Sequence, residues 1–136
     1  MSIIPDNYEL QPAETVPIKK PEAREQARLV AALRCRWSKI ENLALRPVVF
    51  HVPNGGSRNA LEGANLKTQG VLAGVPDLAI VMPFGEMIWI EMKADTGSRS
   101  KKQIDLHDHF DKLGHEVITA YSAEEALDKL RKRVRQ

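Results

Sequence analysis

The sequence predicts an α/β domain, because stretches with helical spacing of apolar residues alternate with stretches rich in β-branched residues. Along the chain the order is helix, strand, short helix, β-hairpin, helix, strand, helix. The 136 residues suffice for one domain, and 43% hydrophobic with 28% charged residues is the balance of a folded globular chain. We expect residues 21–136 to form this single domain. Residues 1–20, with three prolines and no periodicity, should form a flexible arm.

The first half of the chain is predicted to hold one long helix, one short strand and a short helical segment. Pro21 suits the first position of a helix, because that position needs no N–H donor. Pro47 ends this helix, since the residue before a proline is pushed out of helical geometry. Residues 48–52 then form a strand that stops at the glycine-rich turn 53–56, and residues 57–69 are polar and half-helical.

The second half begins with a hairpin that places two acids opposite each other. Residues 77–82 and 87–93 are strand-like, and the Pro-Phe-Gly linker between them suits a three-residue loop whose glycine is left-handed. Counting back along this ladder puts Asp77 opposite Glu91. Because side chains alternate along a strand, Lys93 projects from the same face as Glu91.

The remaining elements carry their own end signals. Ser100 with Gln103 is typical of a capping box that starts a helix, and Gly114 closes that helix. Residues 115–121 form a further strand, and Ser122 starts the last helix.

A facing pair of carboxylates is unfavourable unless a cation lies between them. Two like charges about 4 Å apart repel by about 4 kcal/mol at an effective dielectric near 20. A divalent cation reverses the sign of this interaction, and oxygen ligands with open water positions favour Mg²⁺ or Mn²⁺ over zinc. The alternative is that Asp77 caps a turn and that Glu91 and Lys93 are solvated residues on an exposed sheet face. A Glu-x-Lys triplet alone does not decide between them.

Pro76-Asp77 followed by Glu91-Met92-Lys93 resembles the PD-(D/E)xK nuclease signature. Further segments are similar to the VRR-NUC (virus-type replication-repair nuclease) family, above all to its small stand-alone phage and prophage members. These segments are Glu22 with Gln26, His51–Gly56, Gly70–Leu78, and Ser100 with Gln103. The resemblance covers roughly residues 21–131. It implies a restriction-endonuclease-like core, a small mixed sheet of about four strands flanked by helices on both sides.

The resemblance also implies a Mg²⁺- or Mn²⁺-dependent endonuclease that hydrolyses phosphodiester bonds in DNA. Asp77, Glu91 and the backbone carbonyl of Met92 would hold the metal, and Glu22 would complete the shell directly or through water. Lys93 would orient or deprotonate a metal-bound water and contact the phosphate. No organic cofactor is expected.

Two of these roles have competing explanations in the sequence. On a helical wheel Glu22 falls near the centre of the apolar stripe and Glu25 at its edge, and the family spacing also favours Glu22. Glu22 could instead only complement the helix dipole. Gln103 could serve the capping box, the site, or both.

Candidate DNA contacts lie in predicted loops or near the start of helices. They are His51, Asn54, Arg58, Lys67, Arg99, Lys101 and Lys102. The alternative is a tight turn without a ligand and an ordinary solvated face. His107, His109 and His115 are interpreted as surface or packing residues, because two histidines two residues apart on a helix cannot converge on one metal.

The resemblance to stand-alone members suggests a homodimer that acts on branched DNA such as four-way junctions, since two symmetric sites suit two symmetric cuts. Alternatives are a flap-cutting or duplex-nicking nuclease, and a DNA-binding module that has lost catalysis. The formal net charge of +2 neither proves nor excludes a polyanionic partner.

The single cysteine, Cys35, forbids an intramolecular disulfide and a thiolate-based zinc site. Apolar stretches fall far short of the ~20 residues that span a bilayer, and no signal peptide is visible at the start. We therefore expect a cytosolic protein with no membrane partner, and the resemblance to phage and prophage members implies a bacterial cell or a phage-infected host.

Overall fold

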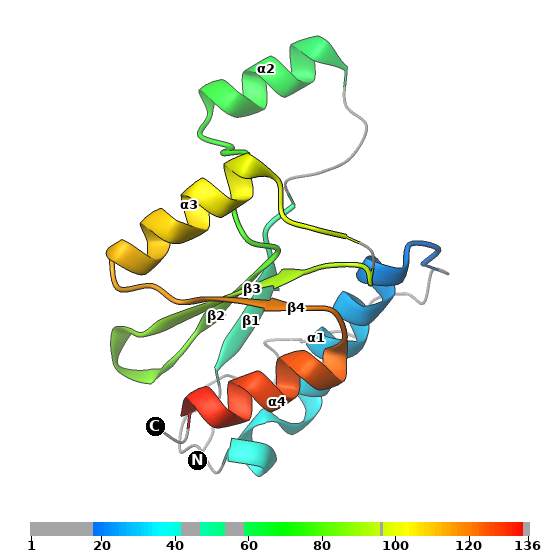
Figure 1. Ribbon diagram of the computed structural model, residues 1–136, viewed down its shortest axis with the longest axis vertical. Coiled ribbons are helices and arrows are strands. Elements are labelled where there is room, and N and C mark those ends of the chain that lie inside the picture. Colours follow the sequence, from blue (N-terminus) through cyan, green and yellow to red (C-terminus); the bar gives the residue numbers. More distant parts are fainter. Residues whose placement is uncertain (1–17, 42–46, 54–58, 96, 135–136) are drawn as a thin grey trace, which may run out of the picture.

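The computed structural model describes residues 18–41, 47–53, 59–95 and 97–134, which form a four-stranded sheet with helices on both faces (Figure 1). The order of elements along the chain confirms the predicted one. The elements are α1 (Pro21–Glu41), β1 (Val48–His51), α2 (Ala60–Thr68), β2 (Leu78–Val81), the 3₁₀ turn η1 (Pro83–Gly85), β3 (Met87–Met92), α3 (Lys101–Lys112), β4 (Val117–Ala120) and α4 (Ala123–Val134). No helix among these described elements is long and apolar enough to cross a membrane.

The sheet is mixed, as predicted, with the strand order β1-β2-β3-β4. β2 pairs antiparallel with both β1 and β3, whereas β4 pairs parallel with β3. Because a parallel neighbour requires a crossover, α3 connects β3 to β4. β3 is therefore an inner strand with a hydrogen-bonded neighbour on each side.

The alternation of side chains along β3 separates the two faces of the sheet. Ile88 and Ile90 point into the main core, where they are buried with Leu29 of α1 and other apolar side chains of β2 and α4. Trp89 points to the opposite face and its ring meets that of Phe110 in α3 edge-on, with centroids 5.2 Å apart. Glu91 follows on the same face as Trp89 and is therefore directed toward α3.

Figure 1 shows α1 and α4 side by side on one face of the sheet and α3 over the other, with α2 projecting from the body of the fold. No residue of α2 is buried. The site that the sequence predicts thus lies between the layers, on the side that α3 covers.

The register of the hairpin is the predicted one. Leu78 pairs with Ile90 and Val81 with Met87, so one step beyond the last pair places Asp77 opposite Glu91. The turn differs in one respect, because both Phe84 (φ 65°) and Gly85 (φ 75°) are left-handed rather than the glycine alone. Two successive left-handed residues give a turn the twist that matches antiparallel strands.

The ends of several elements differ by a few residues from the expected ones. Asp77 precedes β2 and Lys93 follows β3, so both lie at strand ends. The predicted arm falls almost entirely outside the described residues, as do positions 42–46 and the candidate contacts Asn54 and Arg58.

Gly74 holds the segment before Asp77 against the start of α3. It has φ +91°, and a Cβ on it would lie 3.1 Å from the carbonyl oxygen of Lys102, a helix backbone atom that cannot move aside. Gly114 has a similar φ of +87°, but a Cβ there would meet nothing within 4 Å.

We therefore expect Gly74→Ala to destabilise the protein by more than Gly114→Ala. Both substitutions place a side chain in left-handed backbone, at a cost of roughly 1–2 kcal/mol, and only the first adds a steric clash. Urea unfolding of the two variants measures the difference. Equal losses of stability would show that the Gly74 segment is not held against α3.

Candidate functional site

A hollow of about 650 Å³ opens where β2 begins and β3 ends, bounded by the start of α1 and the start of α3. All five candidate catalytic side chains line it. They are Glu22, Asp77, Glu91, Lys93 and Gln103. The hollow therefore gathers residues of α1, β3 and α3 with two residues next to strand ends, all far apart in the sequence.

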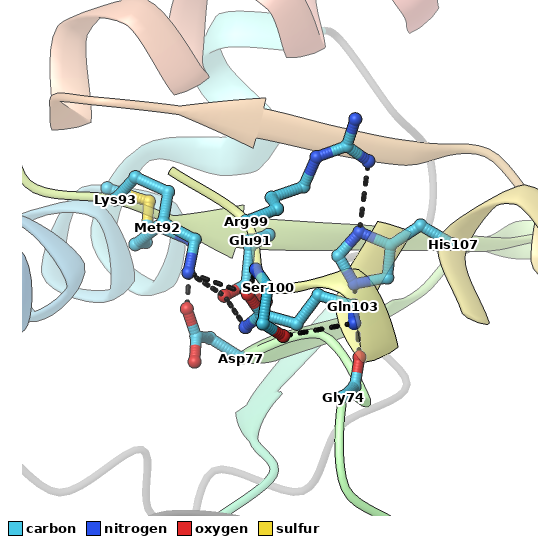
Figure 2. Close-up of polar contacts among 9 residues, drawn as sticks. All are labelled: Gly74, Asp77, Glu91, Met92, Lys93, Arg99, Ser100, Gln103 and His107. Carbon is cyan, nitrogen blue, oxygen red and sulfur yellow. Dashed lines mark hydrogen bonds and ion pairs between the residues drawn. The ribbon is translucent and has the colours of Figure 1, made fainter. Parts of the chain in front are cut away.

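Asp77 is fixed at the end of the hairpin by a backbone contact across the strands. The N–H of Met92 donates to Asp77 Oδ2 at 2.8 Å (Figure 2), and Pro76, which is fully buried, precedes it. Burial raises the pKa of Asp77, and the charge of Glu22 adds to this, while the Met92 N–H and nearby His51 and Lys93 oppose it. A carboxylate in this position is rigid but poorly stabilised as an anion.

Glu91 is the most deeply buried acid of the site, with 2% of its surface exposed. Its Oε1 accepts from Gln103 Nε2 at 2.9 Å and lies 3.4 Å from Lys93 Nζ. Its Oε2 is buried and has no hydrogen-bond partner. Burial, and next the charge of Asp77, raise the pKa of Glu91 to about 7. Such burial contradicts the alternative that Glu91 lies on a solvated sheet face.

Gln103 performs the capping and the site contacts at once. The predicted capping box is confirmed: Ser100 Oγ accepts from the Gln103 N–H, and the Ser100 N–H donates to Gln103 Oε1 at 2.9 Å. The same Oε1 accepts from Lys93 Nζ at 2.9 Å, and Nε2 donates to Glu91 (Figure 2). One amide at the first turn of α3 thus fixes both the lysine and one oxygen of the buried acid.

The two glutamates at the start of α1 are directed to different places. Glu22 lines the hollow, whereas Glu25 accepts from the N–H of Ala123 at the start of α4 and pairs with Arg28. The helical wheel predicts Glu22 on the core side of the helix. In the structure it is instead exposed at the rim of the hollow. The reason is that the first turn of α1 comes before Leu29, where the helix enters the core.

The acidic centre is consequently a pair and not a cluster of three. Within the described parts of the chain, no three His, Cys, Asp or Glu side chains are grouped so that they could hold a metal ion. Asp77 and Glu91 nevertheless suit a hard cation, because one buried oxygen of Glu91 has no partner and the charge of Asp77 raises the pKa of Glu91. Glu22 lies near enough to add its charge.

Three candidate DNA contacts line the same hollow. They are His51, Arg99 and Lys102. His51 Nδ1 lies 2.8 Å from the carbonyl oxygen of Asp77 and 3.0 Å from Gln26 Nε2. Lys101 and Lys67 are exposed but are not part of the lining.

Sequence reasoning missed one lysine of the site, and it interpreted His107 as a surface or packing residue. Lys20 lines the hollow, and its place directly before the helix that carries Glu22 is the signal that could have identified it. His107 is buried, with Nε2 3.1 Å from the carbonyl oxygen of Gly74 and Nδ1 3.4 Å from Arg99 Nη1. Its position one helical turn after Gln103 places it on the same face of α3.

Comparison with known proteins establishes the family. The VRR-NUC domain model matches residues 11–124. This chain belongs to the VRR-NUC nuclease family. A solved structure named as a VRR_NUC domain protein is 21% identical with a TM-score of 0.64, over 88% of this chain and 92% of that one.

A second solved structure, a VRR_NUC domain, is 23% identical with a TM-score of 0.53, over 84% of this chain and 97% of that one. At these identities the two structures support the fold. No curated protein matches the chain. The predicted restriction-endonuclease-like α/β core of the VRR-NUC family is thereby confirmed.

The raised pKa of Glu91 has a consequence for stability in the absence of metal. Because its carboxyl titrates near pH 7 in the folded protein and near 4.5 when unfolded, unfolding releases a proton between these values. The neutral Glu91 carboxyl therefore contributes to the stability of the folded state fully below pH 4.5, and this contribution is lost as the pH rises through 7. Glu91→Gln cannot ionise, so it should remove this loss and exceed the wild type in stability above pH 7.

Urea unfolding in EDTA, from about pH 5 to about pH 8, measures this difference. Glu62→Gln, an exposed acid on α2, should keep the wild-type dependence on pH. If the free energy of unfolding changed with pH in the same way for the wild type and Glu91→Gln, the raised pKa of Glu91 would be contradicted.

Proposed function

We propose that this VRR-NUC protein is a Mg²⁺- or Mn²⁺-dependent endonuclease that cuts branched DNA. The observation that carries the proposal is the buried, unpartnered Oε2 of Glu91, opposite Asp77 and beside a lysine that a glutamine fixes in place. An acid in this condition destabilises the protein, and a divalent cation would relieve it. Membership of a nuclease family supports the same reading.

The residues that would hold the cation are Asp77, Glu91 and the backbone carbonyl of Met92, with Glu22 acting through water from the rim. The three acids line the hollow, and carboxylate and carbonyl oxygens are the donors that Mg²⁺ and Mn²⁺ prefer. When bound, the ion would lower the pKa of a coordinated water and offset charge on the scissile phosphate.

Lys93 has the position of a residue that orients the nucleophile and the phosphate. Its ammonium is held by Gln103 Oε1 at 2.9 Å and Glu91 Oε1 at 3.4 Å, and its side chain is 13% exposed. A lysine has three N–H donors, so one donor remains for a water or a phosphate oxygen in the hollow. Gln103 keeps the ammonium on the site side of β3.

The substrate class follows from the charges at the rim. Lys20, Arg99 and Lys102 surround the acidic pair, and phosphate contacts of this kind supply most of the affinity of proteins for DNA. A homodimer would present two such sites to a four-way junction, which one chain of 136 residues has little surface to grip. A flap or nicked duplex is the second candidate substrate.

A DNA-binding module without catalysis is the remaining alternative. Asp77, Glu91, Lys93 and Gln103 are all present around one hollow. Gln103 is hydrogen-bonded to both Lys93 and Glu91 at 2.9 Å, and Asp77 accepts from the Met92 N–H at 2.8 Å. A module that only binds DNA has no need for a buried acid with an unpartnered oxygen. The arrangement therefore favours the enzyme.

Lys93→Ala should lower cleavage by about 10²–10⁴-fold, the usual contribution of a positioned catalytic group, and should leave DNA affinity nearly unchanged. Labelled four-way junction, flap and plain duplex with Mn²⁺ are the substrates. Lys112→Ala, an exposed lysine in the last turn of α3, is the matched control and should cleave like the wild type. Wild-type protein that cuts none of the three at stoichiometric amounts would refute the enzyme, and full activity in Lys93→Ala would refute the site.

Metal binding should raise thermal stability, because the cation relieves the repulsion between the two acids. At a hundredfold excess over its dissociation constant the ion contributes about 2.7 kcal/mol. Differential scanning fluorimetry with and without Mn²⁺ measures this gain. The gain should disappear in Asp77→Asn and persist in Asp105→Asn, an exposed acid of α3 outside the hollow; a gain retained in Asp77→Asn would place the ion elsewhere.

A further inference from the structure

His107 is a buried imidazole whose two ring nitrogens contact two different segments. It lies on α3 with 3% of its surface exposed, and with Glu91 it forms the pair of buried polar side chains in the described part of the chain. Nε2 lies 3.1 Å from the Gly74 carbonyl oxygen, and Nδ1 lies 3.4 Å from Arg99 Nη1 (Figure 2). The imidazole thus bridges the segment before Asp77 and the segment before α3.

The two partners determine where the proton of the imidazole lies. A carbonyl oxygen can only accept, so Nε2 must carry the hydrogen toward Gly74. A guanidinium can only donate, so Nδ1 must offer its lone pair to Arg99. The neutral Nε2–H form is the one that satisfies both contacts. Burial, and to a smaller degree the charge of Arg99, lower the pKa of His107 in the same sense.

The positive charge of Arg99 is not offset by its partner, because the imidazole of His107 is neutral. Arg28 and Arg133 lie against carboxylates, which cancel much of their field. Among the described residues Arg99 has no carboxylate at ion-pair distance, and its side chain is half-buried in the lining of the hollow. One of its five N–H groups is engaged by His107, and the others remain for an anion.

We infer that His107 is a positioning residue that holds Arg99 toward the hollow for a phosphate of the bound nucleic acid. The inference rests on the proposed function, since the phosphate belongs to the DNA. His107 fixes the direction of the guanidinium without neutralising it, and its second bond ties that guanidinium to the segment that carries Asp77. The phosphate contact and the acidic pair are thereby kept in a fixed relation.

Variants of His107 separate its two contacts. The amide of glutamine reaches the place of Nε2, so His107→Gln keeps a donor for Gly74 and loses the acceptor for Arg99. The amide of asparagine reaches the place of Nδ1, so His107→Asn keeps the acceptor and loses the bond to Gly74. His109→Gln, an exposed histidine on the same helix, is the matched control.

The measurement is the salt dependence of DNA binding in EDTA, which excludes cleavage. Each phosphate contact contributes about 0.9 to the slope of log K against log salt on duplex DNA. Arg99→Ala and His107→Gln should each lower the slope by about this amount. The double variant should lower it no further, since the two changes remove the same contact. His107→Asn and His109→Gln should keep the wild-type slope.

The outcomes distinguish this inference from the proposed function. A wild type that binds no DNA would overturn both. A wild type that binds and cuts DNA, with His107→Gln less stable but unchanged in slope, would overturn the inference alone and leave His107 a structural residue. Additive slope changes in the double variant would do the same.

A spectroscopic measurement on the wild type tests the inference without a variant that must fold. Long-range ¹H–¹⁵N NMR correlations distinguish the two neutral tautomers of an imidazole. We expect the Nε2–H form for His107 at neutral pH in the wild type, and we expect Arg99→Ala to keep it, because the Gly74 carbonyl oxygen still accepts from Nε2. A proton on Nδ1 in the wild type would overturn the inference, because that nitrogen could not accept from Arg99.

Discussion

The burial of Glu91 is the constraint on which the rest of the site depends. The residue is 2% exposed, and only one of its two carboxylate oxygens is hydrogen-bonded. A buried polar atom without a partner costs roughly 1–3 kcal/mol, and more when it is charged. The sheet imposes this position, because Trp89 and Glu91 share a face and the packing of Trp89 against Phe110 fixes which face that is. The apolar contact therefore holds the acid where it is least favourable.

Rigid neighbours are what make such a position possible. β3 is hydrogen-bonded on both sides, by β2 and by β4, so it cannot shift its register to expose Glu91. The Met92 N–H holds Asp77, and Gln103 joins the start of α3 to Lys93 and Glu91. The unfavourable charge is thus confined to the end of one hairpin, and the stability of the main core on the other face of the sheet offsets it.

The sequence predicted the parts of this arrangement that local rules determine. The length of the loop fixed the register that puts Asp77 opposite Glu91, and the spacing of Ser100 and Gln103 fixed the start of α3. The exposed position of Glu22 was not predictable from a helical wheel, which gives a direction around the helix but not the point where the sheet ends. His107 depends on a contact with Gly74, 33 residues away, and no local pattern encodes that distance.

The partners of the cations explain how a chain with a formal charge of +2 can present a basic rim. Arg28 and Arg133, away from the hollow, are neutralised by Glu25, Glu124, Glu86 and Glu116. At the hollow, Arg99 lies against a neutral imidazole and Lys93 against a neutral amide as well as Glu91. Arg28 and Arg133 are thus paired with carboxylates, whereas Arg99 at the hollow contacts an imidazole. Because a carboxylate partner offsets the field of an arginine and an imidazole does not, the choice of partner affects where positive potential lies on a chain of small net charge.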